Sequence, residues 1–129
     1  MAGELETAVR EIFDGLKRKD LEAAMRITDD EVQGVDEISR KWLRGRDELA
    51  EYLRGLMPMV EDVDTELHDV RETVFGDAGV FTCWLEQDYK LEGNNQHVSA
   101  PTTVLFRRRE DGWKMVLFHS IPLSEEEAQ

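Results

Sequence analysis

The chain has 129 residues, of which 29 are acidic and 16 basic, and its formal net charge is -13. This length predicts one domain over residues 1–129, large enough to bury a core without disulfide or metal support. The acidity argues against a nucleic-acid partner, because phosphate backbones would be repelled. Cys83 is the only cysteine, so no intrachain disulfide can form.

The start of the chain does not resemble a secretory signal, because residues 1–4 lead directly into an amphipathic pattern. No stretch approaches the roughly 18 apolar residues that a membrane span needs. We therefore expect a cytoplasmic protein with no membrane partner.

Two amphipathic helices with a short joint are predicted first. Apolar residues from Leu5 to Leu16 recur at helical spacing, which predicts a helix over about residues 4–18. Asp20 is a favourable N-cap for a second helix that carries Leu21 and Ala24.

A short strand and a third helix follow. The weak alternation of Val32, Val35 and Ile38 predicts the strand. Gly45 separates it from a helix that ends at Pro58, because proline cannot continue the helical hydrogen bonds. The buried stripe of this helix consists of Leu49, Tyr52, Leu53 and Leu56.

The second half of the chain has the period of β-strands. Four long strands are predicted over residues 63–75, 80–91, 96–109 and 113–121. We expect a kink near Asp69. The Asp111-Gly112 pair is the strongest turn signal, since glycine takes the positive φ of a tight hairpin. The order of elements predicts an α+β fold, with three N-terminal helices packed on a curved antiparallel sheet.

The last hairpin is apolar on both of its faces. One face carries Val104, Phe106, Val116 and Phe118, and the other carries Leu105, Met115 and Leu117. Three helices can cover only one face, so we expect the second face to be buried in a homodimer.

Three segments resemble the nuclear-transport-factor-2-like, or SnoaL-like, superfamily, whose fold is the cystatin-like cone. They are residues 19–23 (KDLEA), 43–49 (LRGRDEL) and 111–120 (DGWKMVLFHS). The last segment is also similar to the association domain of calcium/calmodulin-dependent protein kinase. The resemblance implies a cone with an apolar cavity and a homodimer formed through the outer sheet face. It leaves the activity open, because the superfamily includes isomerases, dehydratases, cyclases, transport factors and oligomerisation hubs.

The resemblance to ketosteroid isomerases implies a carboxylate base on the first short strand, and Asp36 lies nearest to that position. It is one residue out of register, which would turn its side chain to the other face of the strand. The enolate-binding tyrosine of the first helix has no counterpart here. The alternative, which these departures favour, is that Asp36 is a solvated loop carboxylate.

Two further residues are catalytic candidates. His119 could act as an acid or base near neutral pH, or it could lie on the outer sheet face at a dimer interface. Tyr52 could serve an enzyme, line the cavity mouth together with Trp42, or belong to the core.

Alternation along residues 80–91 directs Cys83, Leu85, Gln87 and Tyr89 to the cavity. The full expected lining is Phe13, Leu16, Trp42, Tyr52, Leu53, Cys83, Leu85, Gln87, Tyr89, Val104, Phe106 and Phe118. In the kinase association domain, arginines stand at the place of Leu85 and near Val104, so an anionic ligand is not expected here.

The sequence predicts no cofactor, because it contains no Gly-rich phosphate loop, and no metal, because its histidines lack ligand spacing. We expect a small dimeric protein whose pocket takes a small hydrophobic or aromatic molecule. One alternative is an isomerase, dehydratase or cyclase. The other is a structural association module.

Overall fold

A computed structural model of the chain describes residues 3–123. Its helices are α1 (Glu4–Lys17), α2 (Leu21–Arg26) and α3 (Arg46–Leu56), and the short 3-10 helix η1 (Met57–Met59) follows α3. Its strands are β1 (Thr28–Asp36), β2 (Leu43–Arg44), β3 (Val60–Phe75), β4 (Ala78–Leu91), β5 (Asn94–Arg109) and β6 (Gly112–Ser120). None of the helices within residues 3–123 is long and apolar enough to cross a membrane.

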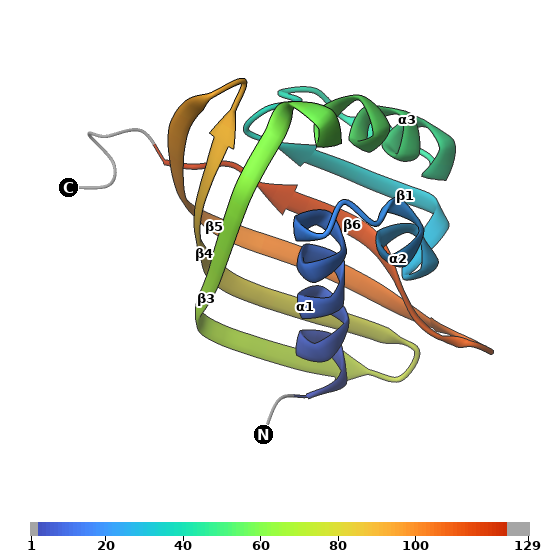
Figure 1. Cartoon of the computed structure of the whole chain (residues 1–129). Coiled ribbons are helices and arrows are strands. Elements are labelled where there is room, and N and C mark those ends of the chain that lie inside the picture. The colour runs from blue at the N-terminus through green and yellow to red at the C-terminus, as the bar shows by residue number, and fades with distance from the viewer. Residues whose placement is uncertain (1–2, 124–129) are drawn as a thin grey trace.

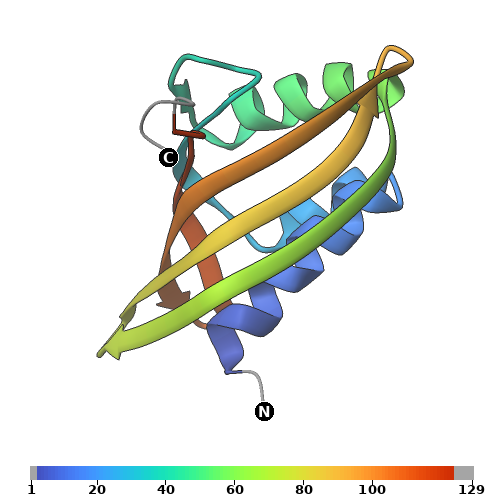
Figure 2. The ribbon, with the colours of Figure 1, turned by 90° about the vertical axis from the view of Figure 1, so that its left-hand side faces the viewer.

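All six strands form one curved sheet in the order β2-β1-β6-β5-β4-β3. Figures 1 and 2 show the sheet curving around α1, with all three helices on its concave side. The expected α+β cone is thus confirmed. The sheet is mixed, however, because β1 pairs parallel with β6 while the other neighbours are antiparallel.

The helix boundaries follow from local chemistry. Leu5 and Val9 are fully buried on one face of α1, as the apolar spacing predicts. The Asp20 side chain accepts a hydrogen bond of 3.1 Å from the backbone N–H of Ala23, which confirms the expected N-cap of α2. At the other end of α1, Glu72 of β3 accepts from the Leu5 N–H at 3.0 Å, so a side chain of the sheet caps the helix.

Strand β3 is kinked twice. Its pairing with β4 shifts between His68 and Arg71, where Asp69 has a φ of 50°. This confirms the kink expected near Asp69. A second shift surrounds Asp62, whose φ is 53°. Short polar residues tolerate this left-handed conformation better than branched ones, which explains aspartate at both sites.

A bulge in β6 corrects the predicted faces of the last hairpin. Leu105 pairs with Leu117, whereas the next residue, Phe106, pairs with Met115, so Val116 is an extra residue. An extra residue reverses the alternation beyond it. Met115 is therefore buried and contributes to the core, and it does not join Leu117 on the outer face as predicted.

Ion pairs fasten the start of β1 to the end of β5. The Asp29 side chain is 2% exposed and accepts hydrogen bonds from Arg107 at 3.0 and 2.8 Å and from Arg109 at 3.0 Å. Burial opposes the ionisation of Asp29, but these hydrogen bonds, together with one from the Glu31 N–H, hold its pKa well below the usual range.

Candidate functional site

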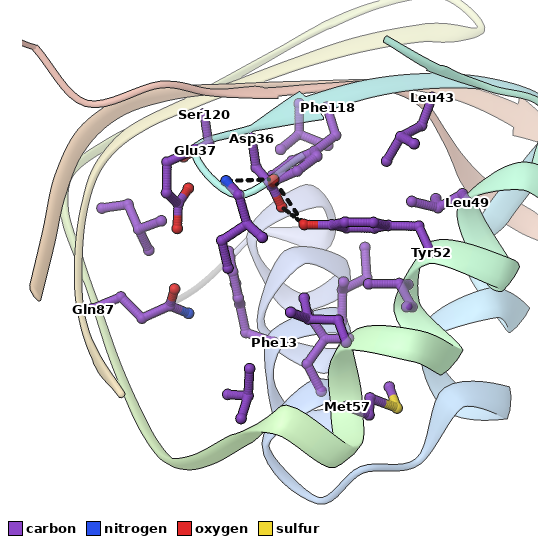
Figure 3. A pocket seen from close by; sticks show the side chains of 18 of the residues that line it. Phe13, Asp36, Glu37, Leu43, Leu49, Tyr52, Met57, Gln87, Phe118 and Ser120 are labelled. Atoms are coloured by element: carbon purple, nitrogen blue, oxygen red, sulfur yellow. Dashed lines mark hydrogen bonds between the residues drawn. The ribbon is translucent and has the colours of Figure 1, made fainter. Parts of the chain in front are cut away.

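A cavity of about 130 Å³ lies inside the cone, between α1, α3 and the concave face of the sheet. Figure 3 shows the side chains that line it. Most are apolar and come from α1, α3 and strands β4 to β6. The polar side chains in the lining are Asp36, Glu37, Tyr52, Gln87, Tyr89 and Ser120.

Asp36 belongs to the lining because of a change of register and a turn. From Thr28 to Gln33, β1 advances five residues while its partner β6 advances two, from Met115 to Leu117. The odd number of extra residues reverses the alternation of β1, which removes the one-residue mismatch expected for Asp36.

The Asp36 carboxylate then organises the turn that follows. Its Oδ1 accepts from the backbone N–H of Ile38 at 3.0 Å and of Ser39 at 2.7 Å. The Ser39 hydroxyl in turn accepts from the Asp36 N–H at 3.0 Å. Because the turn starts at Asp36, strand alternation stops there, and the next residue, Glu37, also lines the cavity.

Tyr52 of α3 reaches across the cavity to Asp36. Its hydroxyl donates to Oδ1 at 3.0 Å and lies 3.2 Å from Oδ2, as the dashed lines in Figure 3 show. Burial, followed by the neighbouring Asp36 charge, raises the pKa of Tyr52 far above its ordinary value. The phenol therefore keeps its proton and presents oxygen lone pairs to the cavity.

Glu37 and Tyr89 form a second pair of the same kind. The Tyr89 hydroxyl lies 3.5 Å from Glu37 Oε1, and Tyr89 itself is 7% exposed. Burial raises the pKa of Glu37, and the neighbouring Asp36 charge raises it further. Hydrogen bonds from the Glu37 N–H and from Tyr89 partly oppose this rise. Burial, then the charges of Glu37 and Asp36, raise the pKa of Tyr89 to about 12.

The other two polar side chains of the lining make hydrogen bonds within the protein. Gln87 Nε2 donates to Thr65 at 3.1 Å. The Ser120 and Thr102 hydroxyls are 2.8 Å apart. Within residues 3–123, no lysine, arginine or histidine lines the cavity and no cluster of side chains is arranged to hold a metal ion. The arrangement can therefore bind an apolar body and orient one polar group.

The structure brings together nine of the twelve residues expected in the pocket. These are Phe13, Leu16, Tyr52, Leu53, Leu85, Gln87, Tyr89, Val104 and Phe118. Cys83 and Phe106 lie instead in the core cluster behind the lining, because they pack against other buried side chains. Trp42 is 43% exposed and stands outside the cavity, with the Arg44 guanidinium 5.9 Å from its ring.

Of the three catalytic candidates, the structure places Asp36 and Tyr52 in the cavity and His119 outside it. His119 is exposed, and its ring centroid lies 6.2 Å from that of Trp42. Of the two alternatives for His119, the structure thus agrees with the position on the outer face of the sheet, away from the cavity.

The main functional candidate that sequence reasoning missed is Glu37. Strand alternation directs attention to every second residue and passes over a neighbour of Asp36. The signal that could have found it is the Asp36-x-x-Ser39 spacing, which is typical of a turn closed by side-chain hydrogen bonds.

The comparisons with known proteins agree with this architecture. One similar structure is that of a protein of the NTF2-like family from Streptomyces avermitilis, which is provisionally named a dehydratase. It is 23% identical with a TM-score of 0.85, and the match covers 94% of this chain and 95% of that one. A ketosteroid isomerase-like protein from Erwinia carotovora is 20% identical, with a TM-score of 0.77 and coverage of 92% and 93%. The CaMKII hub of S. rosetta is 17% identical, with a TM-score of 0.79 and coverage of 95% and 99%.

Identities this low show a shared fold and leave the activity open. A comparison with curated proteins found no significant match. The model of the SnoaL-like domain, however, matches residues 5–124, which is nearly the whole chain. The chain belongs to the SnoaL-like domain family.

Proposed function

We propose that this protein binds a small, largely apolar molecule in the cavity of its cone. The observation that carries the proposal is the unfilled volume of about 130 Å³, lined mainly by apolar side chains, with a few polar groups in its wall. A cavity of this composition is the usual form of a small-molecule site.

The size of the cavity limits the ligand. An apolar protein cavity of about 150 Å³ is known to accept benzene. A volume of about 130 Å³ therefore suits a single ring or a short branched chain. A four-ring steroid would need much more space than this.

Ligand binding is testable through thermal stability. Single-ring compounds such as toluene, benzyl alcohol and benzylamine should raise the unfolding temperature, whereas a steroid should not. A ligand at 100 times its Kd stabilises the folded state by about 2.7 kcal/mol. Differential scanning fluorimetry over this panel would measure the effect, and the absence of any shift would contradict the proposal.

A variant that fills the cavity provides the specific control. Leu85→Trp places a larger side chain in the lining and should abolish the shift caused by ligands. Leu91→Trp, on the same strand but outside the lining, should keep it. Equal shifts in both variants would show that the compounds bind elsewhere.

Acid–base catalysis is the second candidate function, in the isomerase, dehydratase or cyclase class. The observation in its favour is the pair of carboxylates Asp36 and Glu37, both lining an apolar cavity together with Tyr52. A protonated Glu37 could donate a hydrogen bond to a carbonyl, as acids with raised pKa do in proton-transfer enzymes. Deuterium exchange next to the carbonyl of a single-ring ketone would reveal such activity.

The cytoplasmic location stays a prediction.

A further inference from the structure

The hydroxyl protons in the cavity wall are already used within the protein. Tyr52 donates to Asp36, and Tyr89 is directed to Glu37. Thr102 donates to the Ala100 carbonyl at 3.2 Å, so the proton between Thr102 and Ser120 comes from Ser120. The hydroxyls of Tyr52, Tyr89 and Ser120, which line the cavity, therefore present oxygen lone pairs to a ligand.

The charges of the wall have one sign. Asp36 and Glu37 both line the cavity, and no cationic side chain from residues 3–123 does. Asp36 Oδ1 is occupied by two backbone N–H groups and Tyr52. Besides a hydrogen bond from its own N–H, the Glu37 carboxylate has the long contact of 3.5 Å from Tyr89 at its Oε1. Figure 3 shows its carboxylate directed towards the interior of the pocket.

We propose that the ligand is an amine: a single-ring or similarly small apolar body whose ammonium group is bound by the Glu37 carboxylate. This rests on the proposed function of the cavity and names the chemical class that the cavity selects. An ammonium group supplies protons to a wall rich in acceptors, and it balances the charges of Glu37 and Asp36. A ligand carboxylate would face two like charges and would be excluded.

The groups around Glu37 support this assignment. The titratable side chains that line the same cavity are Asp36, Tyr52 and Tyr89, and none of them is a cation. Burial and the Asp36 charge both raise the pKa of Glu37. A bound ammonium group would favour the charged form of Glu37, so an amine and the ionisation of Glu37 should stabilise each other.

Four compounds of matched shape test the proposal on the full chain: benzylamine, benzyl alcohol, toluene and benzaldehyde. Calorimetric or NMR titration should show benzylamine binding about ten- to a hundredfold more tightly than toluene, the range expected for a hydrogen bond to a charged group. Glu37→Gln should remove this advantage and leave toluene binding unchanged. Glu66→Gln, which removes the same charge from an exposed site on β3, should change neither.

The pH dependence gives a readout on the unmodified protein. Benzylamine stays protonated up to about pH 8, so its affinity should rise with pH as Glu37 loses its proton, which the raised pKa of Glu37 moves to a higher pH than for an ordinary glutamate. Benzaldehyde can only accept a hydrogen bond from the protein. Its affinity should therefore fall as the pH rises and Glu37 loses its proton. The opposite trends would show that Glu37 acts as a neutral donor and would overturn the proposal.

The outcomes separate the two levels of inference. If toluene and benzyl alcohol bind and benzylamine has no advantage, the amine assignment fails while the cavity remains a binding site. An advantage that persists in Glu37→Gln also overturns the assignment. If none of the four compounds binds, the proposed function fails with it.

Discussion

Asp29 is the residue whose burial demands the most from its surroundings. A carboxylate with a side chain 2% exposed is unfavourable unless it is paired and fully hydrogen bonded. Arg107 and Arg109 supply that pairing, while their own side chains are 37% and 45% exposed. If the Asp29 charge were removed, the partly exposed arginines could regain hydration. The resulting loss in the free energy of unfolding should therefore be smaller than for a fully buried ion pair.

We predict that Asp29→Asn lowers the free energy of unfolding by about 2 kcal/mol at neutral pH, since hydrogen bonds to a charged group are lost. Urea denaturation measures the difference. Glu31→Gln is the matched control: it removes an exposed partner of Arg107 and should change stability by less than about 1 kcal/mol. Equal losses in the two variants would contradict the role assigned to burial.

The same pair predicts how stability depends on pH. The pKa of Asp29 is lowered on folding, so its contribution is present above the unfolded value of 3.8 and is lost as the pH falls further. The difference in stability between the wild type and Asp29→Asn should therefore stay constant down to about pH 4 and shrink below it.

Among single residues, Asp36 and Tyr52 could be chosen as candidates from the sequence. The contact between them could not be predicted. Their hydrogen bond joins a turn to a helix, and it depends on the irregular register of β1. Residue type and local spacing carry no information about such a shift, which is set by the pairing with β6. Glu37 was missed for a different reason: the turn at Asp36 ends the strand alternation, and the Asp36-x-x-Ser39 spacing that marks this turn was not used.

Among the elements, α1 packs closely on the sheet at Gly79 of β4. A Cβ atom added there would lie 2.7 Å from the Leu5 Cδ1, and Leu5 is fully buried. The glycine is therefore required by the packing of α1 on β4 and not by a turn conformation.

Gly79→Ala should lower the free energy of unfolding by about 1 to 3 kcal/mol, because the core must make room for an added methyl group. Combining it with Leu5→Ala should give a loss smaller than the sum of the two single losses, as the clash disappears. Gly55→Ala in α3, where nothing lies within 4 Å of the added Cβ, should instead stabilise by up to about 1 kcal/mol. Additive losses at Gly79 and Leu5 would refute this packing argument.

The long elements were largely predictable from the sequence, and their irregularities only in part. Alternating apolar residues and the Asp111-Gly112 turn define the last hairpin, which is formed by β5 and β6. The kink at Asp69 was also predicted. The bulge at Val116 was not, because Met115 and Leu117 look equivalent in a strict alternation. The parallel pairing of β1 with β6 joins segments far apart in the chain, and no local pattern encodes it.

At the scale of the molecule, the outer face of the sheet carries a row of apolar side chains. Val80 pairs with Leu105, and Leu105 pairs with Leu117, so the three lie in register across β4, β5 and β6. Each is only partly buried within one chain. Covering this row with a second copy would remove it from water, and we therefore propose that the protein is a homodimer.

Sedimentation equilibrium at micromolar concentration should give twice the monomer mass. Leu117→Asp should convert the protein to monomers, because a charge would be buried at the interface. Val74→Asp, at an exposed position near the tip of the β3–β4 hairpin, is the control and should leave the mass unchanged. A monomer mass for the wild type would disprove the dimer.

The kinked edge strand β3 has a consequence for how copies of the chain can meet. As the last strand of the sheet, it offers unpaired backbone groups on which another strand could be added. The left-handed conformations at Asp62 and Asp69 interrupt the straight line of these groups. The strand also carries six carboxylate side chains, which would repel an identical edge. The acidity that argues against nucleic-acid partners thus also protects the protein from growing, edge to edge, into fibrils.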